Sequence, residues 1–95
     1  MNVQHDIQHS RFVVPLEDGE AQLVYATSGA DAIDLQHTEV PRSDQGRGIA
    51  DALVRAAFAY ARDHELRVIP TCPYVKVWLR RHPQERLASK VDCPT

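Results

Sequence analysis

Two glycines, Gly46 and Gly48, stand where the apolar pattern of the chain changes its period. Residues 32–40 before them are predicted to form a strand, and Pro41 ends it because proline cannot donate a ladder hydrogen bond. After the glycines, apolar side chains recur at helical spacing, at Ile49, Leu53, Ala56, Ala57 and Tyr60. A polar glycine turn therefore joins a strand to the N-terminus of an amphipathic helix.

A turn of this kind is suited to binding an anion. The first N–H groups of a helix have no intrahelical partner, and the helix dipole adds partial positive charge there. Glycine lets a ligand approach the backbone closely, and the side chains of Arg42 and Arg47 can add contacts to phosphate. The segment Gln45-Gly46-Arg47-Gly48-Ile49-Ala50 is therefore interpreted as a pyrophosphate site.

Three other interpretations of this turn compete with that one. It lacks the Gly-Lys-Ser/Thr ending of a nucleotide P-loop. It also lacks the GxGxxG spacing of a dinucleotide-binding turn. The third alternative is a flexible loop that merely begins the helix, and the agreement of strand, turn, helix and flanking arginines weighs against it.

The remaining pattern predicts an α+β domain. Residues 11–15 and 21–27 are predicted strands joined at Glu17–Glu20, where Asp-Gly is a hairpin signal, and with residues 32–40 they form a three-strand antiparallel meander. The helix then leads by a right-handed crossover to a parallel fourth strand at 67–72. A helix over 74–81 and a short helical piece over 85–88 follow. Residues 1–9 are expected to be a flexible arm or frayed strand, 10–88 the domain and 89–95 a tail.

Composition excludes several classes of protein. A chain of 95 residues is enough for one domain, and its net charge of −2 gives no basic footprint for nucleic acid. No apolar run is long enough to cross a membrane, and the first ten residues carry no signal-peptide core, so a cytoplasmic location is expected. The two cysteines and five histidines have no metal-ligand spacing, so no metal site is expected.

The glycine turn and three further segments resemble a known family. The turn is similar to the Q/R-x-x-G-x-G/A motif of the GNAT superfamily of acyl-CoA-dependent N-acyltransferases. The ordered segments His37–Pro41, Gly46–Ala50, Val68–Val75 and Arg81–Pro83 resemble short single-domain GNAT-like proteins. The resemblance covers about residues 10–88.

The resemblance implies a minimal GNAT-type fold that binds acetyl-CoA. Main-chain N–H groups of Gln45–Ala50 would hold the pyrophosphate, and Thr38, Glu39 and Val40 would pair with the pantetheine arm. The third and fourth strands would splay to admit the thioester. The helices that usually wall the acceptor site are missing, because only Glu17–Glu20 lies between the first two predicted strands. The site is expected to be open and the amine acceptor stays unidentified.

Four residues are candidates for the chemistry. Cys72, before the second helix, is either an acyl carrier whose thiolate the helix N-terminus favours or a buried structural cysteine. Glu39 and His37 share a strand face and are either proton carriers or simply hydrogen-bonded surface groups. Tyr74 is either the acid that protonates the CoA thiolate or a packing residue. Trp78 and Phe58 are assigned to packing, and Cys93 is expected to be an exposed, inert tail residue.

Two functions follow from these features. The first is an acetyl-CoA-dependent N-acyltransferase acting on an amine, either a small molecule or a protein. The second is a non-catalytic acetyl-CoA-binding or interaction module with the same fold. The chain is expected to be a monomer or weak dimer, with no nucleic-acid or membrane partner.

Overall fold

The computed structural model describes residues 2–17 and 19–91. They form one five-stranded sheet and three α-helices, with short 3₁₀ turns at Ile7–His9 and Arg42–Asp44. The strands are β1 (Gln4–Asp6), β2 (Arg11–Leu16), β3 (Gly19–Ser28), β4 (Ala32–Glu39) and β5 (Arg67–Pro70). The helices are α1 (Ile49–Asp63), α2 (Pro73–Arg81) and α3 (Pro83–Ala88). Within these described residues, no helix has the length and apolar character needed to cross a membrane.

The sheet confirms the predicted α+β topology and adds one strand. The strands lie in sequence order, the first four antiparallel and β5 parallel to β4. The added strand is β1, in the segment that the sequence pattern left as an arm or a frayed strand, and it pairs with β2 from Gln4↔Val13 to Asp6↔Arg11. The reason is aromatic packing: the His5 ring stacks on Phe12 at 4.2 Å and meets Tyr60 of α1 edge-on at 4.5 Å.

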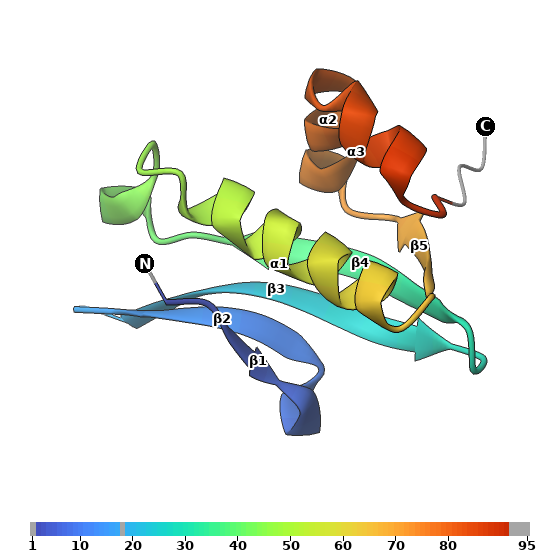
Figure 1. The fold of residues 1–95 in the computed structure, drawn as a ribbon. Coiled ribbons are helices and arrows are strands. Elements are labelled where there is room, and N and C mark those ends of the chain that lie inside the picture. Colours follow the sequence, from blue (N-terminus) through green and yellow to red (C-terminus); the bar gives the residue numbers. More distant parts are fainter. Residues whose placement is uncertain (1, 18, 92–95) are drawn as a thin grey trace.

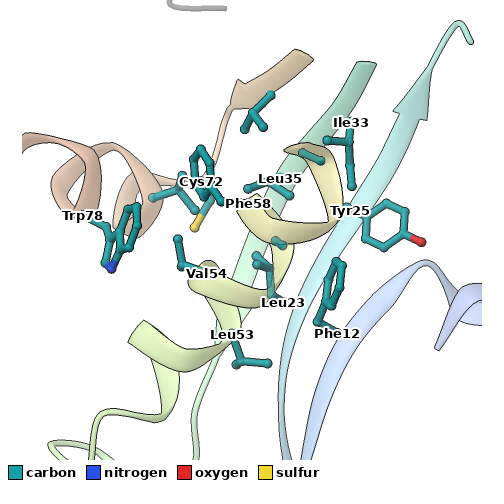
Figure 2. Close-up of a cluster of buried hydrophobic side chains, with 14 of the residues drawn as sticks. Phe12, Leu23, Tyr25, Ile33, Leu35, Leu53, Val54, Phe58, Cys72 and Trp78 are labelled. Atoms are coloured by element: carbon teal, nitrogen blue, oxygen red, sulfur yellow. The ribbon is translucent and has the colours of Figure 1, made fainter. Parts of the chain in front are cut away.

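All three helices lie on one side of the sheet (Figure 1). Helix α1 runs along the sheet and contacts β2, β3, β4 and β5. Figure 2 shows the resulting core, in which strand side chains meet the apolar face of α1, with Phe12, Leu23 and Leu35 opposite Leu53, Val54 and Phe58. Burying these side chains fixes the first turn of α1 relative to the end of β4.

Helix α2 extends the same layer beyond β5. Its buried residues are Val75, Trp78 and Leu79, and the Trp78 ring stacks on Phe58 of α1 at 5.3 Å. Pro73 occupies the first turn, as expected for a residue that lacks an N–H. Pro83 begins α3 rather than continuing α2, so the chain bends at His82.

Two strands end earlier than their predicted limits. Strand β4 stops at Glu39 instead of residue 40, ahead of Pro41. Strand β5 stops at Pro70 instead of residue 72, because the Thr71 amide turns back to the Ile69 carbonyl at 3.0 Å. These shorter strands leave the last residues of β4 without a neighbour on the β5 side.

A β-bulge in β4 decides which of its side chains face α1. Val24 pairs with His37 and Tyr25 pairs with Leu35, so Gln36 is the extra residue. Without the bulge, alternation would place His37 on the same face as Leu35. With it, Thr38 joins the row of Leu23 and faces α1, while His37 lies on the uncovered face.

Candidate functional site

The site begins where β4 and β5 part. Their parallel pairing ends at Leu35↔Pro70, and the Cys72 amide donates to the Leu35 carbonyl at 2.8 Å. Beyond that bond β4 continues through Thr38 and Glu39, whereas the segment that follows β5 turns into α2. The third and fourth predicted strands therefore separate after Leu35 and Pro70, as expected.

The glycine turn lies at the open end of this gap. Gly46 and Gly48 have φ angles of 85° and 78°, a left-handed conformation that glycine adopts without strain. Gly48 is the N-cap of α1, and no side chain caps the helix. A Cβ at either glycine would meet no protein atom within 4 Å. The first N–H groups of α1 have no intrahelical partner, and the space around the two glycines before them is open.

A cavity of about 450 Å³ occupies that space. Its wall combines the end of β4, the glycine turn, the first turn of α1 and one residue of α2. The lining residues are Thr38, Val40, Asp44, Gln45, Gly46, Gly48, Ile49, Ala50, Asp51 and Tyr74. Seven of the predicted ligand-binding residues are among them: Thr38, Val40, Gln45, Gly46, Gly48, Ile49 and Ala50.

The two arginines proposed from the sequence as phosphate contacts do not line the cavity. Arg42 is exposed on the 3₁₀ turn. Arg47 is 66% exposed, and its Nη1 lies 2.8 Å from Oδ1 of Asp44. The cavity wall at the glycine turn therefore consists of main chain and the side chain of Gln45, whose Nε2 donates to the Val40 carbonyl at 3.3 Å.

Tyr74 forms the wall opposite the glycine turn. Partial burial, together with the charge of Asp51, raises the pKa of the Tyr74 phenol above its usual value. The phenol is therefore fully protonated at neutral pH and is able to donate a proton or a hydrogen bond. It lies in the same cavity as the turn, as a proton donor for a departing thiolate requires.

Cys72 lies directly behind the cavity wall. Its side chain is 3% exposed, and Sγ is 3.4 Å from Oγ1 of Thr38, which lines the cavity. Cys72 is also the N-cap residue of α2, the position predicted for it. Thr38 thus separates the sulfur from the cavity by one side chain.

His37 and Glu39 are brought together, but on the other face of the sheet. The imidazole Nε2 lies 2.9 Å from Oε1 of Glu39, and both side chains are about 60% exposed. Glu39 lines a second cavity of about 360 Å³ with Glu20 and Pro41. This cavity shares three wall residues with the first, namely Thr38, Val40 and Gln45.

Sequence reasoning missed the two carboxylates of the main cavity. Asp44 is tied to Arg47, and Asp51 accepts a hydrogen bond from Trp78 Nε1 at 2.7 Å. An acidic residue in the first turn of a predicted helix was a readable signal, but its partner on α2 was not. Cys93 lies outside the described residues. Those residues hold no group of three or more His, Cys, Asp or Glu side chains that could bind a metal ion.

The fold and cavity define a class: a small α+β domain with a cavity between a glycine turn and the point where two parallel strands part. Residues 11–88 match the family of GCN5-related N-acetyltransferases, and the chain belongs to that family. Protein NATD1 of Bos taurus is 38% identical over 85 residues, covering 87% of this chain and 75% of that protein. Protein NATD1 of Homo sapiens is 36% identical over 85 residues, with the same two coverages.

A solved structure supports the same fold. The NMR solution structure of a GCN5-like protein from Staphylococcus aureus superimposes with a TM-score of 0.72 at 19% sequence identity. The match covers 99% of this chain and 90% of that one. The predicted minimal GNAT-type fold is therefore confirmed.

Proposed function

We propose that this protein is an acetyl-CoA-dependent N-acetyltransferase. The observation that carries the proposal is the cavity that joins three features: the uncapped N-terminus of α1, two glycines in left-handed conformation and the protonated phenol of Tyr74. The amides of the turn would bind the pyrophosphate, since the turn lines the cavity and its two glycines leave the space beside the backbone open. The pantetheine arm would run along the unpaired end of β4 toward Thr38 and Cys72.

The transfer would form a C–N bond and break the C–S bond of the thioester. The amine nitrogen attacks the acyl carbonyl carbon, and the sulfur leaves as a thiolate that takes the proton of Tyr74. The attacking nitrogen must also lose a proton. Glu39 and His37 would accept it through water, because they lie on the uncovered face at the same end of β4.

Cys72 offers a second route within the same function. Its thiolate would attack the thioester, release CoA and hold the acyl group until the amine arrives. Its position at the N-cap of α2 and beside Thr38 supports this route. Its burial supports the structural alternative, because Thr38 would have to move to admit the acyl carbon.

The acceptor would approach from the uncovered face. No described helix packs there, and the exposed groups nearest β4 are polar or charged. Few side chains of this protein would surround an acceptor on such a surface. This favours an amine on a large molecule, such as a protein lysine, over a small free amine.

One observation favours the second candidate function, a non-catalytic acetyl-CoA-binding module. His37 and Glu39 lie on the face opposite the main cavity, and Cys72 is buried behind Thr38. A module would need the cavity and the glycine turn but none of these three side chains.

Two measurements test the proposal in sequence. Acetyl-CoA should raise the melting temperature of the protein, because a ligand that binds only the folded state stabilises it by mass action. CoA release should then be measured over a panel of amines and lysine peptides, with Glu39→Gln and Cys72→Ala beside the wild type. Absence of a melting shift would reject acetyl-CoA binding, and a shift without CoA release on any acceptor would favour the module.

Intact-mass spectrometry separates the two routes. A Cys93→Ser variant incubated with acetyl-CoA alone should gain one acetyl group on Cys72 if the cysteine carries it. An unmodified mass, together with full activity of Cys72→Ala, would assign the transfer to direct attack by the amine.

A further inference from the structure

Asp51 connects the first turn of α1 to α2. Its Oδ1 accepts the hydrogen bond of Trp78 Nε1 at 2.7 Å, and its Oδ2 accepts that of Arg55 Nε at 2.9 Å. The guanidinium of Arg55 also lies over the Trp78 ring, 5.5 Å from its centre. One carboxylate thus binds two side chains that are themselves in contact.

The same network continues to the end of α2. The His82 ring stacks on Trp78 at 4.2 Å and its Nδ1 bonds the Trp78 carbonyl at 2.8 Å. Glu85 of α3 lies 3.9 Å from Arg55. Asp51 therefore ties α2 directly to the first turns of α1, while α3 is tied to α1 through Glu85, which pairs with Arg55 and Arg62.

Helix α2 carries the groups that would act on the thioester. Cys72 is its N-cap and Tyr74 stands in its first turn, on the cavity wall that also includes Asp51. Packing alone orients Trp78 by stacking on Phe58, which leaves the ring free to slide in its plane. A hydrogen bond to the indole N–H fixes the remaining freedom, because it specifies one point on the ring edge.

We propose that Asp51 is a positioning residue: by holding Trp78 and Arg55 it fixes α2 against α1 and so keeps Tyr74 facing the acetyl-CoA cavity. The inference rests on the proposed function, because Tyr74 matters only if a thiolate leaves there. Asp51 itself would also weaken the binding of acetyl-CoA. Asp51 lines the cavity that would receive the pyrophosphate, so its negative charge opposes ligand binding.

Charge supports the same assignment. Tyr74 is faced by Asp51, whose charge raises the pKa of the phenol, by Arg81, which lowers it, and by Cys72. Burial tends to raise the pKa of Asp51, but the hydrogen bonds from Trp78 and Arg55 outweigh it and hold that pKa below its usual value. Asp51 is thus ionised at neutral pH and helps to keep Tyr74 protonated.

Four variants separate the hydrogen bond from the charge. Asp51→Asn keeps an acceptor for Trp78 but removes the charge and the hydrogen bond from Arg55, which lies within α1 itself. Asp51→Ala removes the charge and both acceptors, and Trp78→Phe removes the donor on α2. Asp63→Asn is the matched control, since it makes the same change at an exposed position at the other end of α1. Each variant is read by kcat, by the KM for acetyl-CoA, by the pH profile of kcat and by hydrogen exchange of the α2 amides.

The expected results differ between the variants. Asp51→Ala and Trp78→Phe should lower kcat on the order of tenfold, because a misplaced catalytic group costs this much or more, and should speed exchange in α2. Asp51→Asn should leave exchange unchanged, move the alkaline limb of kcat to lower pH and lower KM about threefold by removing a charge from the phosphate cavity. Asp63→Asn should match the wild type in every measurement.

Three results would decide against the inference or against the proposed function on which it rests. If kcat and α2 exchange in Asp51→Ala equal those of the wild type, the positioning role is wrong. If the losses of kcat in Asp51→Ala and Trp78→Phe simply add when the two substitutions are combined, the role is also wrong, because residues of one network are coupled. If the wild type binds no acetyl-CoA while exchange in α2 still rises in Asp51→Ala, the proposed function fails and the anchoring of α2 stands.

Discussion

Replacing Gly48 by alanine tests the main-chain anion site most directly. Gly48 has a φ of 78° and lines the cavity. A non-glycine residue in the left-handed region costs roughly 1–2 kcal/mol. For a domain of this size each kcal/mol lowers the melting temperature by about 4–8 °C, so Gly48→Ala should melt roughly 5–15 °C below the wild type without ligand.

The effect on ligand binding is larger and separable. The added methyl meets no protein atom within 4 Å, so it would occupy the cavity and keep phosphate from the amides. Losing two charge-assisted hydrogen bonds at about 1.5 kcal/mol each raises Kd about 100-fold. At a concentration of 100 Kd, acetyl-CoA stabilises the wild type by about 2.7 kcal/mol, or roughly 10–20 °C. The variant at the same concentration should gain only about 2–3 °C.

Gly29→Ala is the matched control for backbone strain. Gly29 has a φ of 65° in the turn between β3 and β4, and its new Cβ would meet only Asp31, at 3.8 Å. This variant should lose a similar amount of intrinsic stability but keep the full acetyl-CoA shift. Scanning calorimetry of the three proteins, with and without ligand, measures both quantities. Equal ligand-induced shifts in Gly48→Ala and the wild type would refute the main-chain site.

Two further predictions concern protons. Tyr74→Phe should keep the acetyl-CoA melting shift but lower kcat for CoA release by about 100-fold; unchanged kcat would remove Tyr74 as the acid. Burial, helped by His64, lowers the pKa of His5 below its usual 6.5, against a smaller opposing effect of Asp6. The folded state therefore binds fewer protons at that site, so the stability that neutral His5 contributes is present above pH 6.5 and is lost as pH falls below it. Melting temperatures of wild type and His5→Gln between pH 5 and 8 should converge toward acid pH, and parallel curves would contradict this.

The glycine turn was predictable because its signal is local. Gly46, Gly48 and the helical spacing from Ile49 onward lie within one short segment, and backbone conformation there depends on neighbours in sequence. The meander and the parallel fourth strand followed from the same kind of pattern. The strand β1 was predicted only as one of two alternatives, because its packing depends on His5 reaching Tyr60, which is distant in sequence.

The candidate site was predictable in its ligand turn and less so in its side chains. His37 and Glu39 were expected on one strand face, and they share one. Which face they occupy depends on a bulge at Gln36, and no glycine or other turn residue in the sequence indicates that bulge. Arg47 was predicted to add a contact to phosphate, and the sequence did not indicate that it pairs with Asp44, because that residue lies on an unpredicted 3₁₀ turn. The Asp51–Trp78 bond joins two helices, and periodicity describes only one helix at a time.

If the proposed function is correct, the uncovered face of the sheet would determine what kind of acceptor the site recognises. That face is polar and needs no covering layer. Arg11 pairs with Asp6 and Glu20 on the two neighbouring strands, and only a few residues of the face, such as Val13, are buried. Antiparallel sheets tolerate one wet face when its side chains are polar. An acceptor arriving beside Glu39 would therefore displace water from charged groups rather than bury apolar area. Its affinity would depend on charge and fall with added salt, so acceptor KM should rise with ionic strength while a Glu39→Gln variant shows a weaker dependence.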